Sequence, residues 1–135
     1  MARPLVRPLP LTGAPTDVLR RLRGVPGLVA LVGEWCGGGA VVAWEPAEVL
    51  AADADPFDLP LPPVTAGGAA AFGGGWFVLW GYQLGGRLEA VPPPPPRPQP
   101  QPDHWCARYD WVIRYDAASG TWAFETLLEG DLARA

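Results

Sequence analysis

The fold is decided by residues 105–115, which read W-C-A-R-Y-D-W-V-I-R-Y. Apolar and aromatic side chains recur at every second position, namely at Trp105, Ala107, Tyr109, Trp111, Ile113 and Tyr115. Arg108, Asp110 and Arg114 alternate with them. Because successive side chains of a strand point to opposite faces, this alternation predicts one half-buried strand.

Two hairpins are expected, one that begins with the strand of residues 105–115 and one further upstream in the sequence. Residues 116–120 read D-A-A-S-G and predict a turn, after which residues 121–126 return as the hairpin partner of the preceding strand. Upstream, residues 27–33 and 39–44 are apolar runs that contain β-branched residues. Cys36 and the glycines after it separate these runs, so a buried hairpin is favoured over a helix.

The remaining elements are short. Residues 4–11 contain several Pro and predict an edge strand, because Pro has no N–H for a central ladder. Residues 17–23 predict a two-turn helix with Thr16 as its N-cap. Residues 76–82 are rich in aromatic residues and predict a strand, and residues 83–89 predict a single helical turn.

These elements together predict one α+β domain over residues 1–135, rich in antiparallel sheet and with few short helices. Residues 53–75 are expected to be a loop, and residues 92–102 a Pro-rich loop in the polyproline II conformation. The apolar content of 49% and the seven Trp favour a folded chain over a disordered one.

Charge and composition exclude several classes of function. The net charge is −4 and the basic residues are scattered, which disfavours binding to nucleic acid. All ten basic residues are Arg, so the chain has no side-chain amine to form a Schiff base. No Lys is available for a phosphate-binding loop either.

The cysteines and the apolar segments bear on metal binding and location. Cys36, Cys106 and the single His104 do not have the spacing of a zinc site, so no metal is expected in this chain. The N-terminus lacks the apolar region of a signal peptide, and Glu34 interrupts the most apolar stretch, residues 27–46. We therefore expect a soluble, cytoplasmic protein without a membrane partner, in which both thiols are free.

Residues 72–89 form the densest motif of the chain, with glycine groups on both sides of an aromatic strand. Taken alone, this pattern favours close backbone approach at a bend, with the aromatic side chains filling the core. His104 is interpreted as a packing residue at a strand entry, because the sequence places no nucleophile or orienting carboxylate beside it.

The same stretch resembles the Pro-Phe-x-Gly-Gly … Gly-Tyr-(Asp/Glu)-Leu … (Phe/Leu)-Glu signature of the N-terminal domain of component I of the chorismate-aminating synthases, which are aminodeoxychorismate synthase and anthranilate synthase. The matching residues are Phe72, Gly74, Gly75, Gly81, Tyr82, Leu84 and Glu89. The chain departs from the signature at Ala71 and Gln83. Weaker similarity runs from about residue 26 to residue 125.

The resemblance implies a non-catalytic role. In that family the reaction takes place in a larger C-terminal chorismate-binding domain, which uses Mg²⁺ and ammonia from a glutamine amidotransferase subunit. This sequence lacks that domain, so the resemblance implies no catalytic residue and no cofactor here, with Mg²⁺ expected in the missing domain. The expected partners are the chorismate-binding domain and the amidotransferase, in the route to 4-aminobenzoate and folate. The chain is then a stand-alone subunit or a truncated component I.

Family members can bind tryptophan through a Leu-Leu-Glu-Ser type of turn. The similar turn here contains the candidate ligand-binding residues Gly33, Glu34 and Trp35. It has no Ser, and the bulky Trp35 stands where a small residue is expected, so we expect a degraded tryptophan site. This favours the aminodeoxychorismate pathway, with an anthranilate synthase-like piece that keeps a tryptophan regulatory site as the alternative.

Other functions remain open at the level of sequence. The run from Pro92 to Arg97 fits a PxxPxR ligand, so the chain can also be a Pro-rich interaction module of another pathway. A small-ligand regulator with a pocket between the strands of Val29 and Trp76 is a further alternative, and a fragment without function is another. A stiff spacer is the favoured interpretation of the Pro-rich run.

Overall fold

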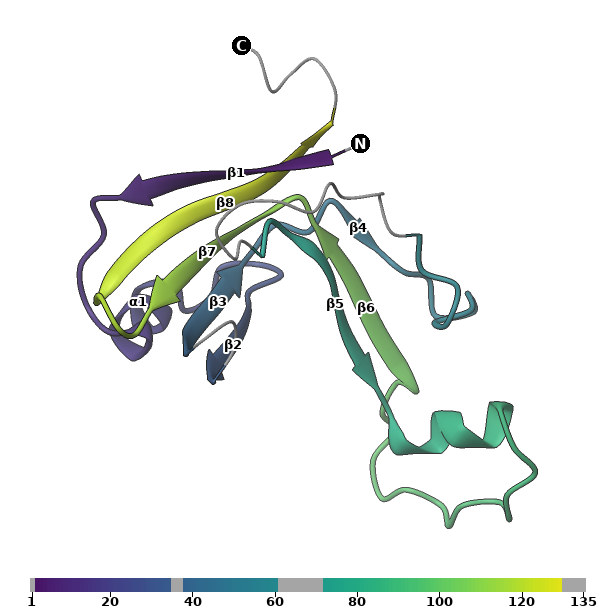
Figure 1. The fold of residues 1–135 in the computed structure, drawn as a ribbon. Coiled ribbons are helices and arrows are strands. Elements are labelled where there is room, and N and C mark those ends of the chain that lie inside the picture. The colour runs from purple at the N-terminus through teal and green to yellow at the C-terminus, as the bar shows by residue number, and fades with distance from the viewer. Residues whose placement is uncertain (1, 35–37, 61–71, 130–135) are drawn as a thin grey trace.

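The computed structural model describes residues 2–34, 38–60 and 72–129 (Figure 1). Among these residues the chain forms two antiparallel sheets and two short helical segments, which confirms the expectation of a small, sheet-rich domain with few short helices. The elements in order are β1 (Ala2–Leu9), α1 (Pro15–Arg21), β2 (Val29–Gly33), β3 (Gly39–Ala43), β4 (Glu48–Val49), β5 (Gly75–Trp80), the 3₁₀ helix η1 (Tyr82–Arg87), β6 (His104–Tyr109), β7 (Trp111–Asp116) and β8 (Thr121–Glu129).

The two sheets are connected through β6 and β7, which follow each other along the chain. The five-stranded sheet has the order β1-β8-β7-β3-β2, and the three-stranded sheet has the order β4-β6-β5. Only Asp110 separates β6 from β7, so the chain passes from one sheet directly into the other at that residue (Figure 1). The hydroxyl of Thr126 on β8 donates a hydrogen bond to the Asp110 carbonyl at 2.6 Å, which ties the bend to the larger sheet.

The prediction of one half-buried strand over residues 105–115 is wrong. Tyr109 and Val112 belong to the same core cluster although they are three residues apart, which an unbroken strand does not allow. The bend at Asp110 therefore exchanges the two faces, and Ile113 joins a different cluster. Cys106 and Val112 are fully buried as well, so both faces of this path are covered.

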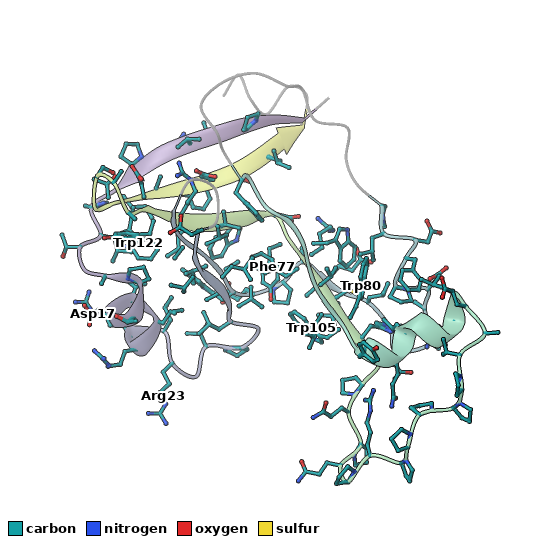
Figure 2. All side chains as sticks on the ribbon, turned by 60° about the horizontal axis from the view of Figure 1, so that its bottom comes forward. Asp17, Arg23, Phe77, Trp80, Trp105 and Trp122 are labelled. Carbon is teal, nitrogen blue, oxygen red and sulfur yellow. The ribbon has the colours of Figure 1, made fainter. Side chains whose placement is uncertain are left out.

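The core lies on both faces of the larger sheet. On one face, Val41 and Ala43 of β3 pack against Phe77 of β5 and Ala107 and Tyr109 of β6. On the other face, a second cluster gathers around helix α1 and consists of Val18, Val42, Ile113 and Trp122 with their half-buried neighbours. Figure 2 shows Trp122 on the side of α1 and Phe77 on the side of the smaller sheet.

The two predicted hairpins and the predicted edge strand are present, with small shifts of their ends. The two hairpins form as expected, because Val29 pairs with Ala43 and Asp116 pairs with Thr121. The Pro-containing strand β1 lies at an edge and pairs only with β8. At the turn after β7, hydrogen bonds from the Ser119 hydroxyl and the Ala118 N–H lower the pKa of the Asp116 carboxyl.

The helix lies two residues earlier than the sequence predicts. Helix α1 begins at Pro15 rather than at Asp17, its N-cap is Ala14 rather than Thr16, and no side chain caps it. Pro suits the first helical position, since its fixed φ fits the helix and its missing N–H would be unsatisfied there. The expected helical turn at residues 83–89 is the 3₁₀ helix η1, and residues 61–71 of the predicted loop lie outside the described part.

Candidate functional site

The glycine-rich half of the motif is a backbone structure that only glycine accommodates. Gly73, Gly74 and Gly75 have φ values of +77°, +108° and +136°, in the region that other residues rarely adopt. A Cβ atom on Gly74 would stand 2.6 Å from the carbonyl oxygen of Tyr109, closer than any real contact. Glycine is therefore required where the loop passes the bend between β6 and β7.

A buried carboxylate holds this glycine loop in place. The Glu125 side chain is completely buried, and its Oε2 accepts hydrogen bonds from the N–H of Phe72 and, at 3.2 Å, from the N–H of Gly73. Its Oε1 accepts a hydrogen bond from Arg114 Nε at 2.5 Å. The ion pair compensates the buried charge, and the two backbone donors are satisfied by the same group.

Sequence reasoning missed the role of Glu125 and Arg114. The alternation of residues 105–115 assigns Arg114 to the polar face of its strand, and Glu125 has no role beyond its place in the expected return strand. One signal is present, namely a lone acid in the otherwise uncharged run T-W-A-F-E-T at residues 121–126. A charge at such a position needs a partner, although the sequence does not identify that partner.

The second half of the motif, residues 81–89, contains both buried and exposed side chains. The N–H of Gly81 donates to the carbonyl of Asp103 at 2.7 Å, and a Cβ on Gly81 would stand 2.8 Å from the same oxygen. Leu84 in η1 is buried, whereas the Tyr82 side chain is fully exposed and Glu89 is exposed. The matched residues therefore split into a structural set, Phe72, Gly74, Gly75, Gly81 and Leu84, and an exposed pair, Tyr82 and Glu89.

Apolar side chains are exposed from β5 through η1 to the start of the Pro-rich segment. We call this set the apolar surface, and its members are Val78, Leu79, Trp80, Tyr82, Leu88 and Val91. Leu79 is 64% exposed and Leu88 is 66% exposed. In Figure 1, η1 and the Pro-rich segment lie at the far end of the β5–β6 hairpin, away from the larger sheet.

A hollow of about 820 Å³ lies beside η1. Its lining is mainly apolar and consists of Tyr82, Gln83, Gly85, Gly86, Val91 and the four residues Pro92–Pro95. A smaller hollow of about 350 Å³ is lined by Asp53, Ala54, Asp55, Phe57, Arg87 and Leu88. The Pro-rich segment and η1 therefore enclose the larger of these two spaces between them.

The degraded tryptophan turn is placed only in part. Gly33 ends β2 and pairs with Gly39, and both Gly33 and Glu34 are exposed. Trp35 lies outside the described residues, so the structure does not place it. Within the described part, the turn and the motif of residues 72–89 belong to different sheets.

His104 and Cys106 lie on one face of β6 and are buried. His104 Nε2 is 3.3 Å from the Ala51 carbonyl oxygen, and its Nδ1 has no hydrogen-bond partner among the described residues. Cys106 is a free thiol, and Cys36 lies outside the described residues. Its burial raises the pKa of the thiol, and a hydrogen bond with the Trp80 side chain partly opposes that shift.

Alkaline pH is expected to destabilise the fold through Cys106 and Tyr109. Burial raises the pKa of both groups, and the Tyr109 hydroxyl donates to the Gly27 carbonyl at 2.6 Å. The unfolded chain loses these protons first, at about pH 8.5 for Cys and about pH 10 for Tyr, so stability falls as pH rises through these values. Urea unfolding at pH 7 and pH 10 measures this decline.

The variant Cys106→Ala is the control for the alkaline effect. It removes the thiol, so its loss of stability between about pH 8 and pH 9.5 should be smaller than that of the wild type, relative to each protein at pH 7. Equal slopes in the two proteins would show that Cys106 does not contribute to the decline.

Comparison with known proteins identified no relative. No family model matches the sequence. No curated protein and no solved structure matches it either. In the described part of the chain, no three His, Cys, Asp or Glu side chains gather to hold a metal ion, and no helix there is long and apolar enough to span a membrane.

Proposed function

We propose that this chain is the non-catalytic N-terminal component of a split aminodeoxychorismate synthase component I, with the fold of the N-terminal domain of that family. In this role it docks onto a separately encoded chorismate-binding domain and completes or stabilises it. The partner domain contains the Mg²⁺ and carries out the chemistry, and a glutamine amidotransferase subunit supplies ammonia. The complex then serves the formation of 4-aminobenzoate for folate.

The apolar surface is the observation that carries this proposal. Tyr82 is fully exposed and Leu88 is largely exposed, on a chain of only 135 residues. Exposed apolar and aromatic side chains are enriched at protein interaction sites. Tyr82 also belongs to the signature shared with component I, and its side chain makes no contribution to the buried core, so a role in docking accounts for it.

The structural set of the signature supports the same assignment. Gly74 and Gly81 stand where a Cβ would collide with backbone carbonyl oxygens. The need for glycine at these positions comes from the course of the backbone. A related chain with the same fold would therefore need glycine at the same two positions. The choice of the aminodeoxychorismate pathway rests on the resemblance and on the missing Ser after Glu34.

Docking is tested by co-purification of the tagged chain from its own cells. We expect a chorismate-binding protein in the eluate, together with formation of aminodeoxychorismate that depends on chorismate and glutamine. The double variant Tyr82→Ser/Leu88→Ser should lose the partner, because it removes two exposed apolar contacts while the buried core is unchanged. Val32→Ser, at an exposed residue of β2 outside the apolar surface, is the matched control and should retain the partner.

Recovery of the chain without a chorismate-binding protein would refute the proposal. Recovery of an unrelated partner, lost on deletion of residues 92–98 but not in the double variant, would favour the Pro-rich interaction module instead. The hollow beside Pro92–Pro95 is the observation that favours a Pro-rich interaction module as the second candidate function.

A further inference from the structure

Strand β5 ends the smaller sheet and leaves one backbone edge without a strand partner among the described residues. Its sequence is G-W-F-V-L-W, with no charged residue and no Pro. Proteins usually protect such edges with charges, Pro or a bulge, because an open edge can pair with another chain. Edge strand β1, by comparison, carries two Pro and two Arg.

The hydrogen bonds around β6 determine which groups of β5 face outward. Ala47 N–H donates to the Arg108 carbonyl at 2.8 Å, and Leu50 N–H donates to the Cys106 carbonyl at 2.9 Å. The even-numbered residues of β6 therefore direct their backbone groups toward β4, and the odd-numbered residues direct theirs toward β5. Since Ala107 lies opposite Phe77, the odd-numbered residues of β5 are the ones that bond to β6.

The N–H and C=O groups of Trp76, Val78 and Trp80 consequently point to the open edge. The bond from Gly81 N–H to the Asp103 carbonyl, at 2.7 Å, follows the same alternation. Figure 1 shows β6 and β4 in this order on one side of β5, and the strands drawn on its other side, β3 and β2, belong to the larger sheet. The edge thus offers three donors and three acceptors, spaced at every second residue.

We infer that this edge pairs with the same edge of a second copy of the chain, in an antiparallel register centred on Val78. The twofold axis then places Val78 opposite Val78 of the second copy and Trp76 opposite Trp80 of the second copy. All three outward-facing residues fall on hydrogen-bonded pairs, each of which exchanges two bonds. The result is one continuous sheet across both copies, with a closed, isologous interface.

The chemistry of the strand favours a second copy as the occupant. The segment from Gly75 to Tyr82 is uncharged, so the twofold axis brings no like charges together. The Trp76–Trp80 cross-strand pairs join aromatic side chains, a favourable combination in antiparallel sheets. Val78 and Trp80, both about half exposed, also lose contact with water in this arrangement.

The interface is small, so the dimer should be weak. Interfaces of standard size reach down to micromolar affinity, and a single strand edge is smaller, so we expect a Kd of about 10 µM to 1 mM. Sedimentation of the full chain over this concentration range should show reversible dimers. A chain that remains monomeric up to about 2 mM would overturn the inference.

Charge substitution at the twofold centre tests the register. Val78→Lys and Val78→Glu each place two like charges side by side, so each variant alone should dimerise at least about tenfold more weakly than the wild type. An equimolar mixture of the two variants should regain dimerisation, because Lys then faces Glu. Unimpaired dimerisation of either single variant, or no recovery on mixing, would overturn the proposed register.

Two controls distinguish the edge of β5 from other surfaces of the chain. Val32→Lys on β2, the other uncharged edge strand, should dimerise like the wild type, and loss of the dimer in that variant would place the interface on β2 instead. Amide hydrogen exchange of the wild type needs no variant. Exchange at Trp76, Val78 and Trp80 should slow with rising concentration, whereas exchange at Phe77 and Leu79, already bonded to β6, should not change.

Discussion

The variant Glu125→Ala is expected to lower the free energy of unfolding by about 3 to 5 kcal/mol. It leaves Arg114, which is only 19% exposed, without its partner, and it removes the acceptor of the Phe72 and Gly73 N–H groups. An unpaired charge and unsatisfied buried donors are both costly, and the substitution creates both. Urea unfolding followed by tryptophan fluorescence measures the change.

Glu48→Ala is the matched control for Glu125→Ala. Glu48 also pairs with an arginine, Arg108, at 3.4 Å, but its side chain is 48% exposed. An exposed ion pair of this kind is worth about 0 to 1 kcal/mol, so this variant should unfold almost as the wild type does. If both variants lost the same small amount of stability, the structural role assigned to the buried carboxylate would be wrong.

The variant Gly74→Ala is expected to lower the free energy of unfolding by about 2 to 4 kcal/mol. The φ of +108° alone costs a residue with a Cβ about 1 to 3 kcal/mol. The remainder comes from the clash with the Tyr109 carbonyl oxygen, 2.6 Å from the new Cβ, because the bend between β6 and β7 must move to relieve it. Thermal and urea unfolding at neutral pH measure the loss.

Gly85→Ala separates this effect from the general cost of replacing glycine. Gly85 lies in η1 and does not have a positive φ, and a Cβ added to it would meet no atom within 4 Å. We expect the free energy of unfolding of the Gly85→Ala protein to differ from that of the wild type by less than about 0.5 kcal/mol. A Gly74→Ala protein as stable as Gly85→Ala would mean that the glycine loop can take another path past Asp110.

Glu125 and Gly74 together determine the position of the loop that leads into β5. The carboxylate holds the start of the loop at Phe72 and Gly73, and Gly74 lets the chain pass the bend before β5 begins at Gly75. Variants at these positions should therefore act through folding. Substitutions at Tyr82, Leu88 and Val78 should act on association, because all three side chains are exposed.

Local features of the fold were predictable from the sequence. Both hairpins follow from apolar runs on either side of turn residues, and the edge position of β1 follows from its Pro residues, which cannot donate to a central ladder. The helix was located to within two residues, because Thr16 has the side chain of a good N-cap, whereas the helix starts one residue earlier, with Pro15 in its first turn. These are short-range properties, which neighbouring residues determine.

Only the tertiary structure decided the features on which the candidate site depends. The exchange of faces at Asp110 is invisible in the alternation of residues 105–115, because Cys106 and Val112 are buried by elements distant in the sequence. Glu125 becomes a structural anchor only when residues about 50 positions away supply its donors. The sequence by itself determined where most strands and turns lie, since backbone propensity is local, but it did not predict β4 or the break of residues 105–115 into β6 and β7. The exposure of Tyr82 and the open edge of β5 depend on which strands become neighbours, and that choice is made by packing across the whole chain.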